Sequence, residues 1–214
     1  MLTFLFADLA GFTALTETHG DDDATNVVSR FYDLAHASLA GNTRLIKTIG
    51  DAVMIIADEP PAAASTALRL AATVHAEAGF PMLRVGLHSG SAVERSGDYF
   101  GAAVNLAARI TAYARSDQIL CTNTVAQSIR NLDIAVIYSV GMVSLKNMAQ
   151  PVELFEIEDS QHRMAYREID PVCRMGLDPG TAPARLPFRD RLYHFCSFAC
   201  AQKFAQAPEL YVES

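Results

Sequence analysis

Two β-rich runs stand almost back to back in the first third of the chain, and this arrangement limits the folds that the chain can adopt. Residues 45–49 and 52–57 are separated by Gly50 and Asp51 alone. So short a turn predicts a β-hairpin, whose strands are antiparallel. Elsewhere apolar runs alternate with segments of helical spacing. Hairpins and strand–helix alternation in one chain exclude a doubly wound parallel sheet and predict an α+β fold, a mixed sheet with flanking helices.

The remaining elements follow from the spacing of apolar residues and from the Gly and Pro residues at their ends. Strands are expected at residues 2–7, 83–89, 118–121, 134–138 and 152–157, and helices at residues 24–39, 60–78, 102–115 and 124–131. Gly11 and the polar stretch 19–23 break the chain, and residues 91–101 are expected to form a polar loop.

The composition of the chain changes after residue 157. Residues 158–163 are polar, and from Asp170 onward the chain is rich in Pro, Arg, Cys and aromatic residues. A polar stretch between two compositions is typical of a linker between domains. We therefore expect a first domain over residues 1–158, a linker over residues 159–167 and a second domain over residues 168–214.

Charge and hydropathy narrow the class of partner. The formal net charge is −7, from 24 acidic and 17 basic side chains, whereas nucleic acids and anionic membranes bind basic surfaces. The longest mostly apolar stretch, residues 134–143, has about half of the roughly 20 residues that a membrane span needs. The N-terminus lacks the basic region and cleavage site of a signal peptide. A cytoplasmic protein without a nucleic-acid or membrane partner is expected.

Two aspartates occupy strand ends that are expected to lie near each other. Asp8 ends the first apolar run, and Asp51 lies in the turn of the expected hairpin. Two carboxylates at strand ends can hold Mg²⁺, which completes its shell with phosphate oxygens and water. Taken singly, each residue is also an ordinary turn or cap aspartate.

Asn105 and Arg109 are four residues apart in an expected helix and therefore share one face. The planar guanidinium of Arg binds phosphate through two hydrogen bonds at once, which makes Arg109 a candidate phosphate ligand. A solvated helix face is the alternative for this pair.

Five segments, read in order, resemble the signatures of class III nucleotide cyclases. They are residues 6–13 (FADLAGFT), 47–51 (KTIGD), 84–90 (RVGLHSG), 98–109 (DYFGAAVNLAAR) and the closing pair 145–147 (LKN) and 151–157 (PVELFEI). The resemblance covers about residues 1–158. It implies a sandwich derived from the ferredoxin-like fold, and an active site formed between two catalytic domains in a head-to-tail homodimer.

The resemblance also implies a role for each matching residue. Asp8 and Asp51 would bind two divalent cations, Mg²⁺ or Mn²⁺, in each active site. Lys47 and Asp98 would read the base, Asn105 would position the ribose, Arg109 would stabilise the transition state, and Lys146 would hold the triphosphate. The chain has only three lysines, and two of them fall on these positions.

The identity of the base follows from donors and acceptors. Adenine offers N1 as an acceptor and N6 as a donor, which match Lys47 and Asp98, whereas guanine presents the reverse pattern. We therefore expect an adenylate cyclase that converts ATP to 3′,5′-cyclic AMP and pyrophosphate. Two alternatives remain: a guanylate cyclase, and a catalytically silent protein that binds nucleotide or responds to metal and uses the domain for dimerisation.

The second domain is marked by clustered cysteines. Cys173, Cys196 and Cys200 fall within 28 residues, with 22 and then 3 residues between them. The segments DPVCRM and YHFCSFAC around them resemble a YHS domain of the TRASH-like group, over about residues 168–212. Arg174 departs from the usual pattern, in which Gly is common.

A module of about 45 residues has little core and usually needs a staple such as a metal ion. Cys196 is expected at the end of a strand with Cys200 one helical turn further on, and His194 is expected on the same side of that strand. Three cysteines, with or without His194, suit Zn²⁺ or Cu⁺. The alternative is that the thiols are small buried side chains of the core.

Overall fold

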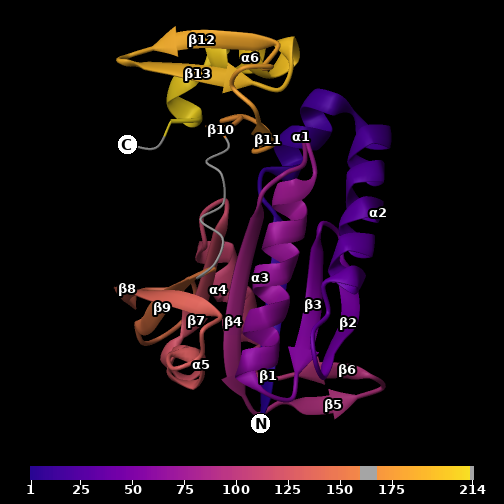
Figure 1. Cartoon of the computed structure of the whole chain (residues 1–214), viewed down its shortest axis with the longest axis vertical. Helices are drawn as coiled ribbons and strands as arrows, with labels where there is room; N and C mark the ends of the chain where they lie inside the picture. The colour runs from indigo at the N-terminus through magenta and orange to yellow at the C-terminus, as the bar shows by residue number, and fades with distance from the viewer. Residues whose placement is uncertain (160–167, 213–214) are drawn as a thin grey trace.

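The computed structural model describes residues 1–159 and 168–212. Most of the expected linker, residues 160–167, lies outside the described residues, as do residues 213–214. Figure 1 shows a main body built on one sheet, with the C-terminal module at one end of it beside the first two helices.

The main body is built on a seven-stranded sheet in the order β2-β3-β1-β4-β7-β9-β8. Its strands are β1 (Leu2–Leu9), β2 (Thr43–Ile49), β3 (Ala52–Ala57), β4 (Leu83–Gly90), β7 (Gln118–Thr122), β8 (Ala135–Val143) and β9 (Val152–Asp159). Strands β4 and β7 are parallel and the other neighbours are antiparallel, β2 and β3 as the expected hairpin. The sheet is mixed, which confirms the α+β prediction.

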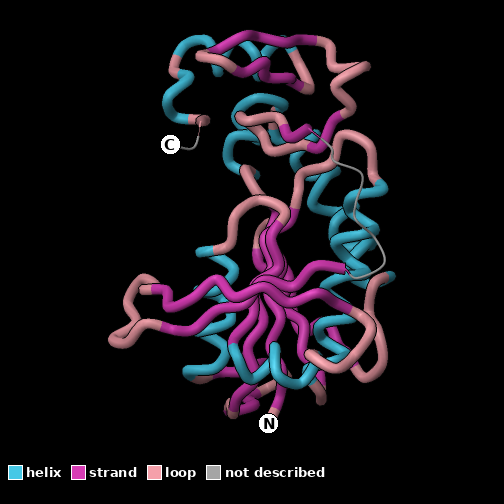
Figure 2. The backbone as a smooth tube through the Cα atoms, turned by 60° about the vertical axis from the view of Figure 1, so that its left-hand side comes forward, coloured by secondary structure: helices cyan, strands magenta, loops and turns pink. Residues whose placement is uncertain are grey.

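Helices cover both faces of this sheet. Helices α2 (Asp21–Ala37), α3 (Pro60–Ala76) and α5 (Asn123–Ile129) pack in one cluster with Leu5 and Leu9 of β1. Helix α4 (Ala102–Tyr113) packs in another cluster with Phe4 and Phe6 of the same strand. Because side chains alternate along a strand, these two sets lie on opposite faces of the sheet. Figure 2 shows the strands fanned out with helices around them.

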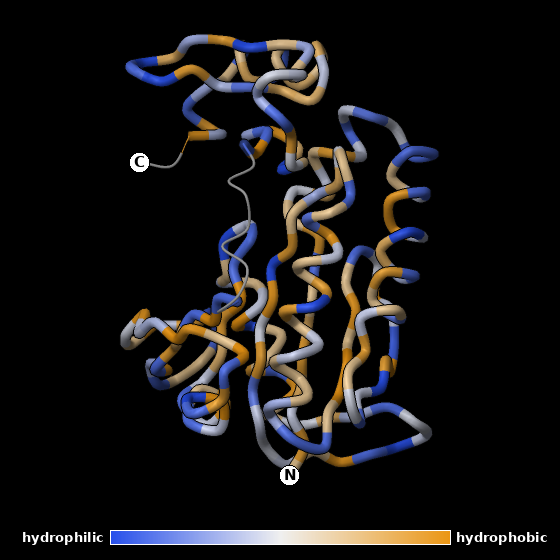
Figure 3. The backbone as a smooth tube through the Cα atoms, in the orientation of Figure 1, coloured by the Kyte–Doolittle hydropathy of each residue, from blue (hydrophilic) through white to orange (hydrophobic). Residues whose placement is uncertain are grey.

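Strand β1 lies at the centre of the sheet, between β3 and β4. Residues 3–7 are all buried, and Figure 3 shows the central strands as largely hydrophobic. A strand buried on both faces is a continuous apolar run, as this sequence is. Asp8 follows directly and shares the α4 face with Phe4 and Phe6, so the core of the domain fixes the position of this carboxylate.

Two parts of the chain contain structure that the sequence did not predict. Helix α1 (Phe12–His19) occupies the stretch between the two expected breaks, and Leu15 is its only buried residue. The expected loop 91–101 contains a hairpin of β5 (Val93–Arg95) and β6 (Asp98–Phe100). Its turn residues Ser96 and Gly97 have φ angles of 53° and 78°, as a tight two-residue hairpin turn requires.

The C-terminal module is small and rich in aromatic side chains. Its elements are β10 (Glu168–Ile169), β11 (Gly176–Leu177), β12 (Ala184–Phe188), β13 (Arg191–Phe195), α6 (Phe198–Gln206) and the 3₁₀ helix η1 (Pro208–Leu210). Phe204 packs against Phe188, Tyr193, Phe195 and Tyr211. These contacts form the apolar centre of the module.

The module is docked on the main body through backbone hydrogen bonds and a shared apolar cluster. The Met82 N–H donates to the Arg174 carbonyl at 3.1 Å, and the Gly176 N–H donates to the Phe80 carbonyl at 3.0 Å. Leu15 of α1 and Ala24 of α2 belong to the same buried cluster as the module's cysteines and phenylalanines. The contact therefore concentrates on the first two helices and on the segment that leads into β4.

Gly86 allows α4 to approach β4 closely. A Cβ atom at this position would lie 2.4 Å from the Thr111 backbone nitrogen and 2.8 Å from the Ala107 carbonyl oxygen. Contacts this short with backbone cannot be relieved by rotation of a side chain. Gly86 therefore sets how deeply α4, with Asn105 and Arg109 on it, sits on the sheet.

We predict that Gly86→Ala lowers the free energy of unfolding by about 3 kcal/mol, because α4 must move away from the sheet. Gly97→Ala is the control: nothing lies within 4 Å of its Cβ, and only its positive φ is unfavourable, so a loss of about 1 kcal/mol is expected. Denaturant unfolding of the two variants measures the difference. Equal losses would contradict the close approach.

Candidate functional site

The structure brings Asp8 and Asp51 together. Asp8 lies near the carboxyl end of β1, and Asp51 lies in the turn between β2 and β3, which pairs with β1. The Leu9 N–H donates to the Asp51 carbonyl at 3.1 Å, which ties the turn to the strand end. Asp51 raises the pKa of Asp8 by its charge and by a side-chain hydrogen bond.

The Asp8 carboxyl is held in an environment that disfavours its charge. Burial raises its pKa, the neighbouring Asp51 raises it further, and the Arg84 guanidinium opposes both, leaving a value of about 6. Arg84 stands opposite Asp8 in the register of β4 with β1, and the two side chains form an ion pair. A pair of carboxylates that repel each other in a partly buried place fits a divalent cation, which favours the ionised form of both.

Lys47 and Asp98 form a second group. The Lys47 Nζ donates to both carboxylate oxygens of Asp98, at 2.8 and 2.6 Å, and lies 5.8 Å from the centre of the Phe100 ring. The hydrogen bond from Lys47, and then the one from the Tyr99 backbone N–H, lower the pKa of Asp98. A donor and an ionised acceptor therefore stand side by side at the start of β6.

The other expected site residues lie on separate elements. Asn105 and Arg109 are one turn apart on α4, with Asn105 exposed and Arg109 half-buried. Lys146 is exposed in the turn between β8 and β9. The structure thus assembles two pairs, Asp8 with Asp51 and Lys47 with Asp98, and presents the remaining three side chains on α4 and on this turn.

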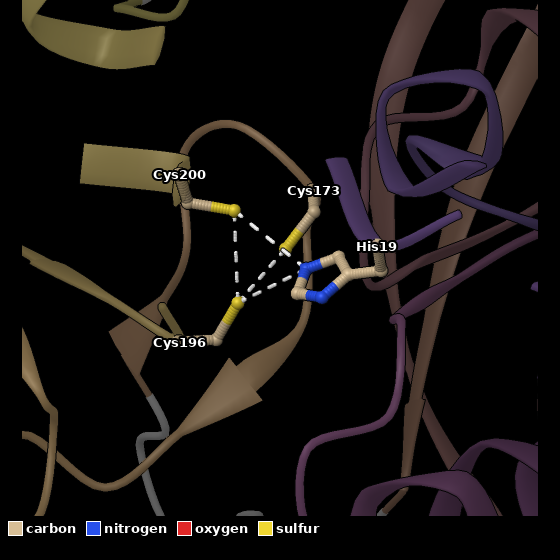
Figure 4. A group of neighbouring side chains, drawn as sticks. All are labelled: His19, Cys173, Cys196 and Cys200. Atoms are coloured by element: carbon tan, nitrogen blue, oxygen red, sulfur yellow. Dashed lines mark hydrogen bonds between the residues drawn. The ribbon is translucent and has the colours of Figure 1, made fainter. Parts of the chain in front are cut away.

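The three cysteines of the C-terminal module converge (Figure 4). The Sγ atom of Cys196 lies 3.4 Å from that of Cys173 and 3.7 Å from that of Cys200. The fourth member of the group is His19, the last residue of α1, whose Nε2 lies 3.5 Å from the Cys196 Sγ and 3.8 Å from the Cys200 Sγ. The ligand atoms of all four residues lie within 4.8 Å of one another.

His194 lies outside this group, although the sequence suggested it as a fourth ligand. Its ring faces Glu168, with the Nδ1 atom 3.9 Å from the Glu168 carboxylate. Cys196 follows the end of β13 instead of continuing it, so the alternation that put His194 and Cys196 on one side does not extend to Cys196.

Asp170 ties together the two separate segments that carry Cys173 and Cys196. Its buried carboxylate accepts the backbone N–H groups of Val172 at 2.8 Å, Cys173 at 3.4 Å and Cys196 at 2.8 Å. Burial raises the pKa of Asp170, and hydrogen bonds from the backbone of Cys196 and Val172 oppose this. Within the group, hydrogen bonds with Cys173 and Cys196 lower the pKa of Cys200, which favours a thiolate.

Cys121 is unrelated to this group. It is fully buried on β7, and burial raises the pKa of its thiol to about 12. The structure thus separates one packing cysteine from three cysteines that share a site.

Three residues of these sites were missed by sequence reasoning. Arg84 lies in an expected strand, but it faces Asp8 only because of the strand order, which no local pattern shows. Asp170 is close to Cys173 in the sequence, and this proximity alone indicates no role. His19 lies in a polar stretch that predicts a break, and more than 150 residues separate it from the cysteines, so no local signal connects them.

Sequence comparison agrees with this architecture. The family described as "Adenylate and Guanylate cyclase catalytic domain" matches residues 1–159, and the YHS domain family matches residues 169–214. The chain belongs to the adenylate and guanylate cyclase catalytic domain family, with a YHS domain after it. The resemblance inferred from the sequence motifs is confirmed.

Individual relatives match parts of the chain. A pH-sensitive adenylate cyclase of Mycobacterium tuberculosis is 40% identical over 128 residues, which are 60% of this chain and 32% of that protein. A copper-transporting P-type ATPase of Rhizobium leguminosarum is 49% identical over 43 residues, 20% of this chain and 5% of that protein. This chain spans about a third of the length of the first curated relatives, 31–33%.

The fold is similar to that of solved cyclases. A Trypanosoma brucei adenylate cyclase structure superposes with a TM-score of 0.67 and 21% identity, over 83% of this chain and 94% of that chain. This similarity supports the cyclase fold. In the described parts of the chain, no helix has the length and apolar character needed to cross a membrane.

We predict that Asp8→Asn stabilises the cation-free protein by about 1–2 kcal/mol at pH 7.5, because it removes a disfavoured charge. The pKa of about 6 in the folded state lies above the ordinary aspartate value of 3.8, so the folded state binds this proton more tightly than the unfolded state. The gain in the free energy of unfolding of Asp8→Asn over the wild type is therefore present above pH 6 and is lost as the pH falls toward 4.

Denaturant unfolding between pH 4 and 8 measures this difference. Asp58→Asn, at an exposed carboxylate, is the control and should leave stability unchanged. Mn²⁺ should stabilise the wild type and not the Asp8 variant. An Asp8→Asn variant that is less stable at every pH would show that the ion pair with Arg84 outweighs burial and Asp51.

Proposed function

We propose that this chain is an adenylate cyclase that converts ATP to 3′,5′-cyclic AMP and pyrophosphate. The observation that carries the proposal is the pair formed by Lys47 and Asp98, at 2.6–2.8 Å. Adenine presents N1 as an acceptor beside N6 as a donor, and a donor beside an acceptor is its complement. The adenylate cyclases among the relatives support the same choice of nucleotide.

Asp8 and Asp51 would hold two divalent cations, Mg²⁺ or Mn²⁺. When bound, such cations lower the pKa of a coordinated hydroxyl and neutralise phosphate charge. The protein's own contribution is to fix the two carboxylates on β1 and on the turn of the hairpin. Without a cation, Arg84 would offset part of the unfavourable Asp8 charge, because its guanidinium pairs with that carboxylate.

The remaining groups would position the nucleotide. Asn105 would orient the ribose so that its 3′-hydroxyl faces the α-phosphorus in line with the leaving pyrophosphate. Arg109 would stabilise the charge that develops there, and Lys146 would hold the polyphosphate. The attack is intramolecular, so positioning and charge stabilisation supply most of the rate.

A two-fold homodimer would complete each active site. In the arrangement that the family resemblance implies, one protomer supplies the carboxylates and its partner supplies the base-reading and Arg groups. One chain carries one full set of these active-site groups, so a head-to-tail dimer would contain two equivalent sites.

A cytoplasmic location fits ATP as the substrate and the four free cysteines, since thiols persist in reducing compartments.

The three cysteines of the module would bind a thiophilic cation, Zn²⁺ or Cu⁺. The convergence of their sulfur atoms at 3.4–3.7 Å supports this, as does the absence of any disulfide among them. A metal-free core of buried thiols is the competing interpretation.

One observation favours a second function. Arg84 already pairs with Asp8. If no cation replaced Arg84 at Asp8, the chain would bind nucleotide without turnover. It would then serve as a dimerisation or metal-responsive module. A guanylate cyclase is disfavoured by the donor and acceptor order of Lys47 and Asp98.

Product analysis by chromatography tests the proposal. The protein is incubated with ATP or GTP and Mn²⁺ or Mg²⁺, beside Asp51→Asn, and the neutral change Asp58→Asn serves as control. Cyclic AMP is expected from the wild type and the control, with a loss of more than about 100-fold in Asp51→Asn. Formation of cyclic GMP from GTP as fast as cyclic AMP from ATP would contradict adenine as the preferred base. If folded, dimeric protein formed no cyclic product, this would favour the catalytically silent alternative.

Mixing two inactive variants tests the shared site. Asp51→Asn and Arg109→Ala homodimers should each be inactive, because every site lacks one essential group. In an equimolar mixture about half of the dimers are mixed and each of these has one intact site, so about a quarter of wild-type activity should return. A mixture that stays inactive while subunits exchange would contradict a site shared between protomers.

A further inference from the structure

His19 belongs to the cyclase domain and yet points at the cysteines of the YHS module. It is the last residue of α1, and the three thiols come from the module that begins after residue 168. Figure 4 shows the imidazole and the three sulfur atoms directed toward one common point. The resemblance to a YHS domain covers only the C-terminal module. It therefore accounts for the three cysteines and not for His19.

Four of the six distances between the ligand atoms are close to those of a tetrahedral zinc site, and all six are within 4.8 Å. Bond lengths of about 2.3 Å for Zn–S and 2.0–2.1 Å for Zn–N place sulfur atoms about 3.8 Å apart, and nitrogen about 3.6 Å from sulfur. The structure has sulfur–sulfur distances of 3.4 and 3.7 Å and nitrogen–sulfur distances of 3.5 and 3.8 Å. The four side chains could therefore bind Zn²⁺ with only small movements.

The surrounding contacts hold His19 in this place. Leu15, one turn before it on α1, is fully buried in the cluster that contains Cys173 and Cys200. Glu17 on the same helix pairs with Lys203 of α6 at 3.1 Å. Helix α1 has only eight residues, fewer than the about 12–15 that an isolated helix needs, so it depends on these contacts for its stability.

We propose that His19 completes, with Cys173, Cys196 and Cys200, a four-ligand Zn²⁺ site that bridges the cyclase domain and the YHS module. The inference rests on the metal site proposed for the module and not on cyclase activity. Its consequence is that zinc fastens the module to α1. That helix begins four residues after Asp8, so zinc occupancy is expected to set the order of the segment that leads out of the catalytic carboxylate.

Two matched variants test the fourth ligand. His19→Gln removes the proposed ligand, and His194→Gln removes the histidine of the module that faces Glu168 instead. Full-length proteins are stripped with chelator, checked for folding by circular dichroism, and titrated with Zn²⁺ against a chromophoric chelator. One Zn²⁺ per chain is expected for the wild type and His194→Gln, with affinity about 100-fold weaker in His19→Gln.

X-ray absorption at the zinc edge gives a second, independent measurement. The wild type and His194→Gln should show three sulfur ligands, one nitrogen ligand and the outer-shell scattering of an imidazole, and His19→Gln should lose the imidazole signal. Retention of that signal and of full affinity in His19→Gln, or their loss in His194→Gln, would overturn the inference. A wild type that binds no Zn²⁺ would overturn it together with the proposed metal site.

Hydrogen exchange tests the bridge itself. Zn²⁺ should slow amide exchange in α1 of the wild type at least about tenfold and leave α1 of His19→Gln unchanged. Equal exchange in α1 with and without Zn²⁺ would overturn the bridge. Because these readouts need no nucleotide, a failed cyclase assay would leave them unaffected, so failure of the bridge and failure of the proposed activity are distinguishable.

Discussion

The burial of the Asp8 carboxylate at the end of a central strand, beside a second carboxylate, is the constraint on which the proposed active site depends. Asp8 cannot move away from Asp51, because β1 is the central strand of the sheet and its residues 3–7 are packed on both faces. Burial and the neighbouring charge together raise the pKa of Asp8, and Arg84 compensates only in part. The folded core thus maintains an arrangement that is unfavourable without a cation, as expected where function conflicts with stability.

Much of the fold could be predicted, because apolar periodicity and turn residues report local structure. The apolar run before Asp8, and the hairpin with Gly50 at its turn, determined the central strands and ruled out a parallel sheet. The pairing of Asp8 with Asp51 could be expected for the same reason, since both aspartates end strands. The pairing of Lys47 with Asp98 came from the family resemblance, because these residues are 51 positions apart and no local pattern connects them.

What the sequence did not reveal depends on tertiary contacts. Helix α1 has one buried residue and no apolar stripe, so its hydrophobic pattern is weak, and it forms because the C-terminal module covers Leu15. His19 joins the cysteines only once that helix exists. Arg84 faces Asp8 through strand register, which depends on the order of β1 and β4 in the sheet.

Helix α1 therefore connects the two proposed metal sites. Asp8 lies four residues before α1, and His19 is the last residue of that helix, so only 12 residues, 8–19, connect the Asp8 carboxylate with the imidazole beside the three thiols. Gly11, in between, has a φ of 73°, and a Cβ there would lie 2.8 Å from the Arg174 side chain and 3.1 Å from the Cys173 carbonyl oxygen. A displacement of the module thus cannot leave this segment unaffected, because an eight-residue helix has too few internal contacts to persist alone. The YHS module is, in physical terms, part of the support of the strand end that carries Asp8.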